Sequence, residues 1–125
     1  MHLGHPATIV TAAAKTLVAQ DLDSSFIAAG SAACVFTLPN MIPVVSASGQ
    51  GTTVTHSVYF YSAVDQNMQI LPPAGQTLST LNNAAAASCT FSTTAMKIGA
   101  CAVAFWANQK WNVVNLSTGA AMTVA

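Results

Sequence analysis

The sequence contains no Arg and no Glu, and only three Lys and three Asp. Its formal net charge is therefore zero, and 5% of its 125 residues are charged. Soluble surfaces are usually about a quarter to a third Lys, Arg, Glu and Asp, and a net charge near zero favours association. A monomer of this size exposes roughly 6,000 Å², which leaves about one charge per 1,000 Å². We therefore expect much of the surface to be buried against other protein.

The lack of charge also excludes several classes of partner. Nucleic-acid binding depends on Lys and Arg that neutralise phosphates, and three scattered lysines cannot form such a patch. An anionic membrane surface requires a basic cluster as well. The longest strictly apolar run, residues 100–107, is far shorter than the ~20 residues that a membrane-spanning helix needs. We expect no nucleic acid, no membrane and no secretory signal, because the N-terminal residues lack a basic region and an apolar core.

Cysteines are few, and no metal motif accompanies them. Cys34, Cys89 and Cys101 form no CxxC spacing, and their odd number argues against a complete set of disulfides and for a reducing compartment during assembly. Each precedes a Phe by two or four residues on the same predicted face, which predicts that all three are buried. A thiol nucleophile would need a base, and only His56 could serve. Because His56 shares a face with Val58 and Phe60, we expect a core or interface histidine.

The remaining candidates for chemistry are weak. His2 and His5 have HxxH spacing, but no Glu exists to complete a metalloprotease helix. Asp21 and Asp23 lie two apart on a predicted strand and could bind Ca²⁺, but a solvated or hydrogen-bonded pair is the favoured reading. The sequence contains no GxSxG, GxGxxG or GxxxxGK[ST] motif. We predict no enzyme, no catalytic residues, no cofactor and no metal.

Apolar residues, 53% of the chain, are enough to exclude disorder, and their spacing is that of β-strands. Val58 and Phe60 are expected inward, with Tyr59 and Tyr61 on the other face. Runs at 32–38, 88–92, 100–106 and 110–116 are similar, and residues 108–109 are expected to form a hairpin turn. Strand-like runs recur every 8–15 residues, as in a sandwich or barrel.

Two further expectations concern the organisation of the chain. We predict one all-β domain, residues 15–125, preceded by an arm, residues 1–14, and we find no repeat at a fixed period. The Ala-rich stretches 12–19 and 83–87 are the alternative, helical reading, since Ala is the best helix former, but both are short.

Large aromatic side chains are expected on both faces of the sheet. Trp106 and Trp111 flank the predicted hairpin turn, and Tyr59 and Tyr61 alternate with Phe60. One face could pack the core while the other packs a second layer of the same subunit. The charge deficit favours a different arrangement, in which small residues such as Ala102 and Ala104 mix with rings at a subunit or capsid interface. The predicted interface residues are Trp106, Trp111, Tyr59 and Tyr61.

The order of several segments resembles a known group of virion proteins. These segments are Ala32-Ala-Cys-Val-Phe-Thr-Leu-Pro39, Ser57-Val-Tyr-Phe-Tyr61, Met68-Gln-Ile-Leu-Pro-Pro73 and Ala104-Phe-Trp-Ala-Asn-Gln-Lys-Trp-Asn-Val-Val114. They are similar to the small β-domains of tailed bacteriophages that occur in capsid decoration (cement) proteins and in trimeric fibre or spike heads. The match covers roughly residues 15–116. It departs from the usual pattern where Lys110, in place of Gly, precedes Trp111.

The resemblance implies a homotrimer of single-domain β-sandwich subunits, jelly-roll or tulip-like, with no catalytic site. It implies a structural protein of the virion, made in the host cytoplasm, that binds the capsid surface and clamps neighbouring major capsid subunits. A short chain that begins at Met1, without heptads or shaft repeats, favours a decoration protein. The arm at residues 1–14 would then lace onto the shell or onto an adjacent subunit. The alternative is a receptor-binding or fibre-tip domain of a tail fibre or head fibre.

Overall fold

The fold is all-β, as predicted. The computed structural model describes residues 7–41, 55–93, 95–107 and 109–125, and in that part of the chain it contains twelve strands, one 3-10 turn (η1, Ala19–Asp21) and no α-helix. The strands are β1 (Ala7–Val10), β2 (Ala14–Thr16), β3 (Ser25–Ala28), β4 (Cys34–Thr37), β5 (His56–Ser62), β6 (Met68–Leu71), β7 (Leu78–Thr80), β8 (Asn83–Ala86), β9 (Cys89–Phe91), β10 (Cys101–Ala107), β11 (Lys110–Asn115) and β12 (Thr123–Val124).

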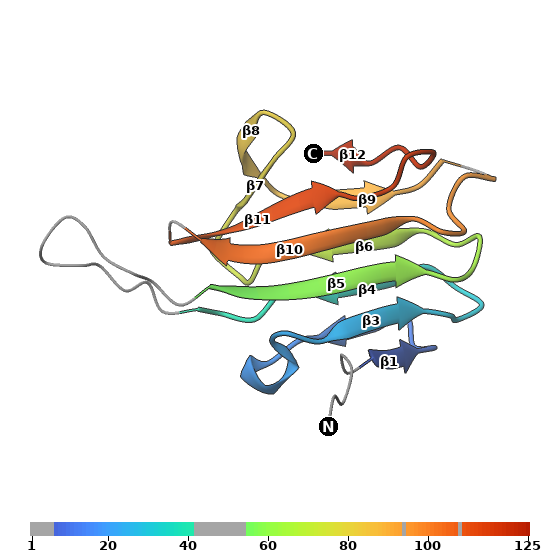
Figure 1. Cartoon of the computed structure of the whole chain (residues 1–125), viewed down its shortest axis with the longest axis horizontal. Coiled ribbons are helices and arrows are strands. Elements are labelled where there is room, and N and C mark those ends of the chain that lie inside the picture. Colours follow the sequence, from blue (N-terminus) through green and yellow to red (C-terminus); the bar gives the residue numbers. More distant parts are fainter. Residues whose placement is uncertain (1–6, 42–54, 94, 108) are drawn as a thin grey trace, which may run out of the picture.

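The strands form two sheets that lie one behind the other (Figure 1). The seven-stranded sheet has the order β1-β3-β5-β10-β11-β7-β8, and the five-stranded sheet has the order β12-β9-β6-β4-β2. Phe36 of β4 joins the two layers, because its ring centroid lies 6.1 Å from that of Phe26 in β3 and 4.9 Å from that of Phe60 in β5. The core lies between the layers and takes large, fully buried side chains from both sheets: Phe26, Phe36, Phe60, Phe91, Met68, Ile70, Leu78 and Trp111.

Alternation along the strands decides which side chains enter this core. In β5, Val58 and Phe60 are buried, whereas Tyr59 and Tyr61 are 38% and 42% exposed. The predicted faces of this strand are therefore confirmed. The predicted hairpin of β10 and β11 is also confirmed, since the two strands pair in antiparallel register from Ala102 to Ala107.

The inward face of β10 differs from the prediction. Ala102 and Ala104 are fully buried, while Cys101 and Phe105 are only partly buried on the outer side. Ala102 pairs with Phe60 of β5, so a small side chain lies beside a large one in the inner row and the core volume is filled without strain. The predicted core position of Cys101 and the predicted interface role of the two alanines are both wrong.

The first six strands alternate between the sheets and so wind as a stack of three rungs, each made of one strand from each sheet. Strands β1, β3 and β5 are parallel neighbours in the seven-stranded sheet, and β2, β4 and β6 are parallel neighbours in the five-stranded sheet. Ser25 pairs with Tyr59 and Cys34 pairs with Met68, so the second and third rungs are 34 positions apart in both sheets. The first and second rungs are closer in sequence, because Ala7 pairs with Ser25 and Ala14 with Val35, so the rungs stack without one fixed period.

This register agrees with the absence of a fixed period in the sequence. At the inner positions of the two rungs, Phe26 matches Phe60, but Phe36 matches Ile70. Matching positions of the second and third rungs share their burial but mostly not their residue type, so comparison of the two segments by sequence does not reveal the match. The parallel pairing also corrects the jelly-roll part of the predicted fold, since jelly rolls are built from antiparallel strands.

The corners of the rungs stack as closely as the strands do. Gly30, in the corner between β3 and β4, lies against the corner that follows β1. A Cβ atom at this position would lie 2.4 Å from the carbonyl oxygen of Thr11. Only glycine permits such a close approach of two backbones.

Part of the expected arm and both Ala-rich stretches belong to the β-structure. Within the expected arm, β1 pairs with β3, Val10 is buried and Ala14 begins β2; residues 1–6 lie outside the described part. The Ala-rich stretches form β2, η1 and β8 instead of helices. Stretches this short do not hold an isolated helix, and pairing with β4 and β7 satisfies their backbone groups.

Candidate interaction surface

The outer side of the seven-stranded sheet carries most of its large side chains in two rows that cross the strands. Ser25, Tyr59, Val103 and Val114 form one row through β3, β5, β10 and β11. The second row runs through β1, β3, β5 and β10. It contains Ile9, Ile27, Tyr61 and Cys101. We call these two rows together the outer face.

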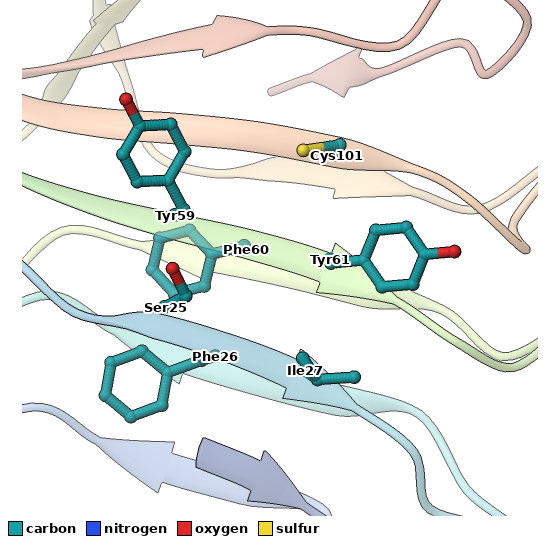
Figure 2. A pocket seen from close by; sticks show the side chains of 7 residues that line it. All are labelled: Ser25, Phe26, Ile27, Tyr59, Phe60, Tyr61 and Cys101. Carbon is teal, nitrogen blue, oxygen red and sulfur yellow. The ribbon is translucent and has the colours of Figure 1, made fainter. Parts of the chain in front are cut away.

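A shallow pocket of about 360 Å³ lies on the outer face between β3, β5 and β10. Figure 2 shows Tyr59 and Tyr61 projecting from β5, with their rings leaning in different directions, and Ile27 and Cys101 on the neighbouring strands. The pocket is lined by Ser25, Phe26, Ile27, Tyr59, Phe60, Tyr61 and Cys101. Apart from the hydroxyl groups of Ser25 and the tyrosines, its side chains are apolar or thiol, which suits an apolar side chain of a partner.

Charge is absent from both rows of the outer face. Lys110, at the start of β11, lies on the same side of the sheet but outside the two rows, and its ammonium donates a hydrogen bond to the carbonyl of Ala84. The accessible surface of the chain is 7007 Å², so its six formal charges are about as sparse as the sequence predicts. Burial of the two rows against a partner would therefore remove no charged side chain of these rows from water.

The outer side of the five-stranded sheet is more polar. Thr37, Gln69 and Thr90 lie there, each partly buried, and the Gln69 amide donates a hydrogen bond of 3.1 Å to the Thr90 hydroxyl across β6 and β9. The neighbouring Val35 and Leu71 are the apolar members of this side. The two sides of the molecule therefore differ, and the outer face of the seven-stranded sheet is the better candidate for an interface.

The tryptophans predicted for an interface lie in the core. Trp111 has no exposed surface and Trp106 has 7%; their rings meet edge to face at 5.7 Å as cross-strand partners. The indole N–H of Trp111 donates a hydrogen bond of 2.9 Å to the carbonyl of Pro39, which follows β4 of the other sheet. A side chain without exposed surface cannot contact a partner, so the predicted interface role of Trp111 is wrong. Trp106 keeps a small exposed surface beside Thr77 and Lys110, and its interface role, like that of Tyr59 and Tyr61, stays a prediction.

The three thiols fall into two groups. Cys34 and Cys89 are buried, as predicted, and Cys101 lies in the outer-face pocket. Burial raises the pKa of all three thiols. A nucleophilic cysteine needs the opposite shift, because the thiolate is the reactive form. This arrangement gives no support to a thiol enzyme.

His56 begins β5 and is not buried in the core, so of the expected core or interface role only the interface role stays a prediction. Its side chain is 28% exposed, and its Nδ1 lies 3.0 Å from a carboxylate oxygen of Asp23. The other carboxylate oxygen accepts the backbone N–H of Ser57 at 3.1 Å. Asp23 has a φ of 62°, which Asp tolerates better than most residues. The pair thus fixes the turn before β3 to the start of β5.

The expected hydrogen-bonded reading of the two aspartates fits their geometry. Asp21 accepts the backbone N–H of Val18 at 2.9 Å, whereas Asp23 turns to β5, so each carboxylate has its own protein partner. His2 and His5 lie outside the described residues. Within the described ranges, no three or more His, Cys, Asp and Glu side chains gather at one point, and no helix has the length and hydropathy to cross a membrane.

Sequence reasoning misses Ile9, Ile27 and Val103 as members of the outer face. The alternation of β5 identifies the exposed tyrosines, but the neighbours of the tyrosines depend on strand order and register, which one sequence does not supply. Comparison of the chain with protein-family models, curated proteins and solved structures gives no match, so the outer face is interpreted from its own geometry.

Proposed function

We propose that this chain is a structural virion protein: a homotrimeric decoration (cement) protein that binds the outside of a bacteriophage capsid and clamps neighbouring major capsid subunits. The observation that carries the proposal is the outer face, which presents Ile9, Tyr59 and Tyr61 to solvent in two rows that contain no charged residue. Isolated exposed apolar residues need no explanation, but a contiguous set marks an interaction surface. The sequence resemblance to phage decoration proteins supports the same function.

Trimer assembly through this face, and attachment of the trimer to the capsid, would both depend on apolar burial, because the chain has only six formal charges. Burying one large apolar side chain contributes about 1.5–3 kcal/mol, whereas an exposed ion pair contributes about 0–1 kcal/mol and is screened by salt. Tyr59 and Tyr61 around a pocket are the kind of residues that dominate binding energy at interfaces. We therefore expect the protein to stay on virions when salt rises to about 1 M. Release by salt alone would show that the attachment is electrostatic.

The two stacked sheets support the inference of a sandwich subunit, with the core between the layers and the outer face available for the trimer. Three copies that each bury the outer face would remove its apolar surface from water. The polar side of the five-stranded sheet would remain in solvent.

A receptor-binding or fibre-tip domain is the second candidate, and one observation favours it. The parallel rungs β1–β6 are arranged like the stacked strands of β-helical shafts, although the sequence contains no shaft repeat. In this alternative, the pocket between Tyr59 and Tyr61 would bind a receptor.

Matched charge substitutions on the two sides of the molecule test the proposed interface. Tyr61→Lys places an ammonium on the outer face, and Gln69→Lys places one on the outer side of the five-stranded sheet. We expect Tyr61→Lys to lower the mass in solution from trimer to monomer and Gln69→Lys to leave it unchanged. Equal masses for both variants and the wild type would exclude the outer face as the trimer interface.

Electron microscopy of virions of the phage that encodes the chain separates the two candidate functions. A gold-labelled antibody against the chain should decorate the head at symmetric positions if the protein is a decoration protein. Labels confined to tail or head fibres would support the fibre-tip alternative, and virions without any label would contradict both.

A further inference from the structure

The stack of rungs is open at its N-terminal end. Strands β1 and β2 are edge strands of the two sheets, and each pairs with one described strand only. The carbonyls of Val10 and Ala13 point into the stack, where they accept the N–H groups of Ala29 and Val35. Because backbone groups alternate in direction along a strand, every second residue of β1 and of β2 has its N–H and C=O groups directed away from the stack. The free groups belong to Ala7 and Ile9 in β1 and to Ala14 and Thr16 in β2.

Such an end is a template for pairing with another chain. Its two free edges belong to different sheets and face the same way, because β1 and β2 form one rung. A single strand could satisfy only one of the two edges. A second copy of this chain brings two edges with the same separation, so it can pair with both edges at once.

The inner positions of the terminal rung are unlike those of the next two rungs. Lys15 in β2 is in register with Phe36 in β4, which is in register with Ile70 in β6. Where the following rungs place large apolar side chains, the terminal rung places an amine. The Lys15 ammonium lies 5.8 Å from the centroid of the Phe26 ring, on the facing sheet.

We propose that the open end of the rungs has the geometry to pair with a second copy of the chain, and that Lys15 prevents this pairing. End-to-end pairing of two copies would bring two Lys15 side chains into one buried row. The same row holds Thr8, Val10 and Leu17, none of which can neutralise an ammonium, and burying an unpaired charge is strongly unfavourable. An inward-pointing Lys on an edge strand is a known protection against such pairing. Lys15 is thus a residue that prevents end-to-end pairing of two copies.

Three variants test the proposal by light scattering, each compared with the mass of the wild-type protein. Lys15→Ile continues the apolar inner row to the end of the stack, and we expect its mass to be at least twice that of the wild type. Lys97→Ile removes the same charge from the turn before β10, away from the open end, and should have the wild-type mass. Both variants are compared at the same concentration, with circular dichroism to show that each is folded.

The double variant Lys15→Ile/Thr16→Pro identifies the surface that pairs and leaves the outer face unchanged. Proline at position 16 removes an N–H from the free edge of β2, where it points away from β4, and proline is tolerated at sheet edges. We expect this variant to return to the wild-type mass. Lys15→Ile with unchanged mass would overturn the proposal, and so would association that persists in the double variant. Because each mass is taken relative to the wild type, the result does not depend on the proposed trimer.

Discussion

The hydrogen bond between Trp111 and Pro39 ties the two sheets together, and the Trp106–Trp111 pair allows its contribution to be measured. Trp111→Phe removes the indole N–H and leaves the Pro39 carbonyl without this donor. Trp106→Phe removes the same atoms from the ring that packs against Trp111 at 5.7 Å. Both variants lose similar volume and the same aromatic contact, so the difference between them reports mainly on the bond.

The size of the difference follows from the burial of Trp111. A buried carbonyl that loses its partner costs about 1–3 kcal/mol, and this cost applies to Trp111→Phe alone. With an unfolding slope of about 2 kcal/mol per M urea, the midpoint of Trp111→Phe should lie about 0.5–1.5 M below that of Trp106→Phe. Far-UV circular dichroism is the suitable assay, because both variants change the fluorescence. Protein concentration must be held constant, since association adds to apparent stability.

Equal midpoints for the two variants would refute this reasoning. A larger loss in Trp106→Phe would do the same, because it would place the more important contact at the end of β10 and not between the sheets.

Three further predictions concern the rungs, the thiols and the turn before β3. Gly30→Ala should destabilise the protein by about 1–3 kcal/mol because its Cβ meets the Thr11 carbonyl, whereas Gly119→Ala, which meets no atom within 4 Å, should change the free energy of unfolding by less than about 0.5 kcal/mol; equal losses in urea titration would contradict the stacked corners. In Tyr61→Lys protein, one thiol per chain should react with a thiol reagent before denaturation, and faster as the pH rises, because burial raises the pKa of Cys101; rapid reaction of Cys34 or Cys89 in the native protein would contradict their burial. Asp23→Ala should cost about 1 kcal/mol through the lost bond to Ser57, and Asp23→Asn should cost less, since Asn keeps an oxygen acceptor and tolerates positive φ; an equal loss in both variants would show that the bond to Ser57 contributes little.

Local pattern was enough to predict the strands and the inward residues of β5, but not the way in which the strands are assembled. Alternation is a property of a few consecutive residues, so Val58 and Phe60 are recognisable as core residues from the sequence. The stack of rungs depends on pairs such as Cys34 with Met68, which share burial and not identity. Such a stack becomes visible only when the register of distant strands is known.

The residues of the candidate interface were likewise only partly predictable from local pattern. The two tyrosines were predicted for the exposed side of β5 and lie there, but Trp106 and Trp111 were assigned by residue type. Tryptophan is enriched at interfaces and is also the largest side chain that a core can bury. The choice depends on which face of β10 is inward, and the sequence alone does not show this. In the structure, Ala104 is the inner neighbour of Trp106 along β10 and leaves room for the large Trp106 ring.

The oligomeric state of the purified wild-type protein is the most direct test of the account. The central claim is that the outer face is buried against copies of the chain in a homotrimer. Multi-angle light scattering at micromolar concentration should give about 38 kDa, three times the chain mass of 12.8 kDa. A single species of 12.8 kDa over the whole concentration range would contradict the claim, because the outer face of the seven-stranded sheet would then be stable in water without a partner.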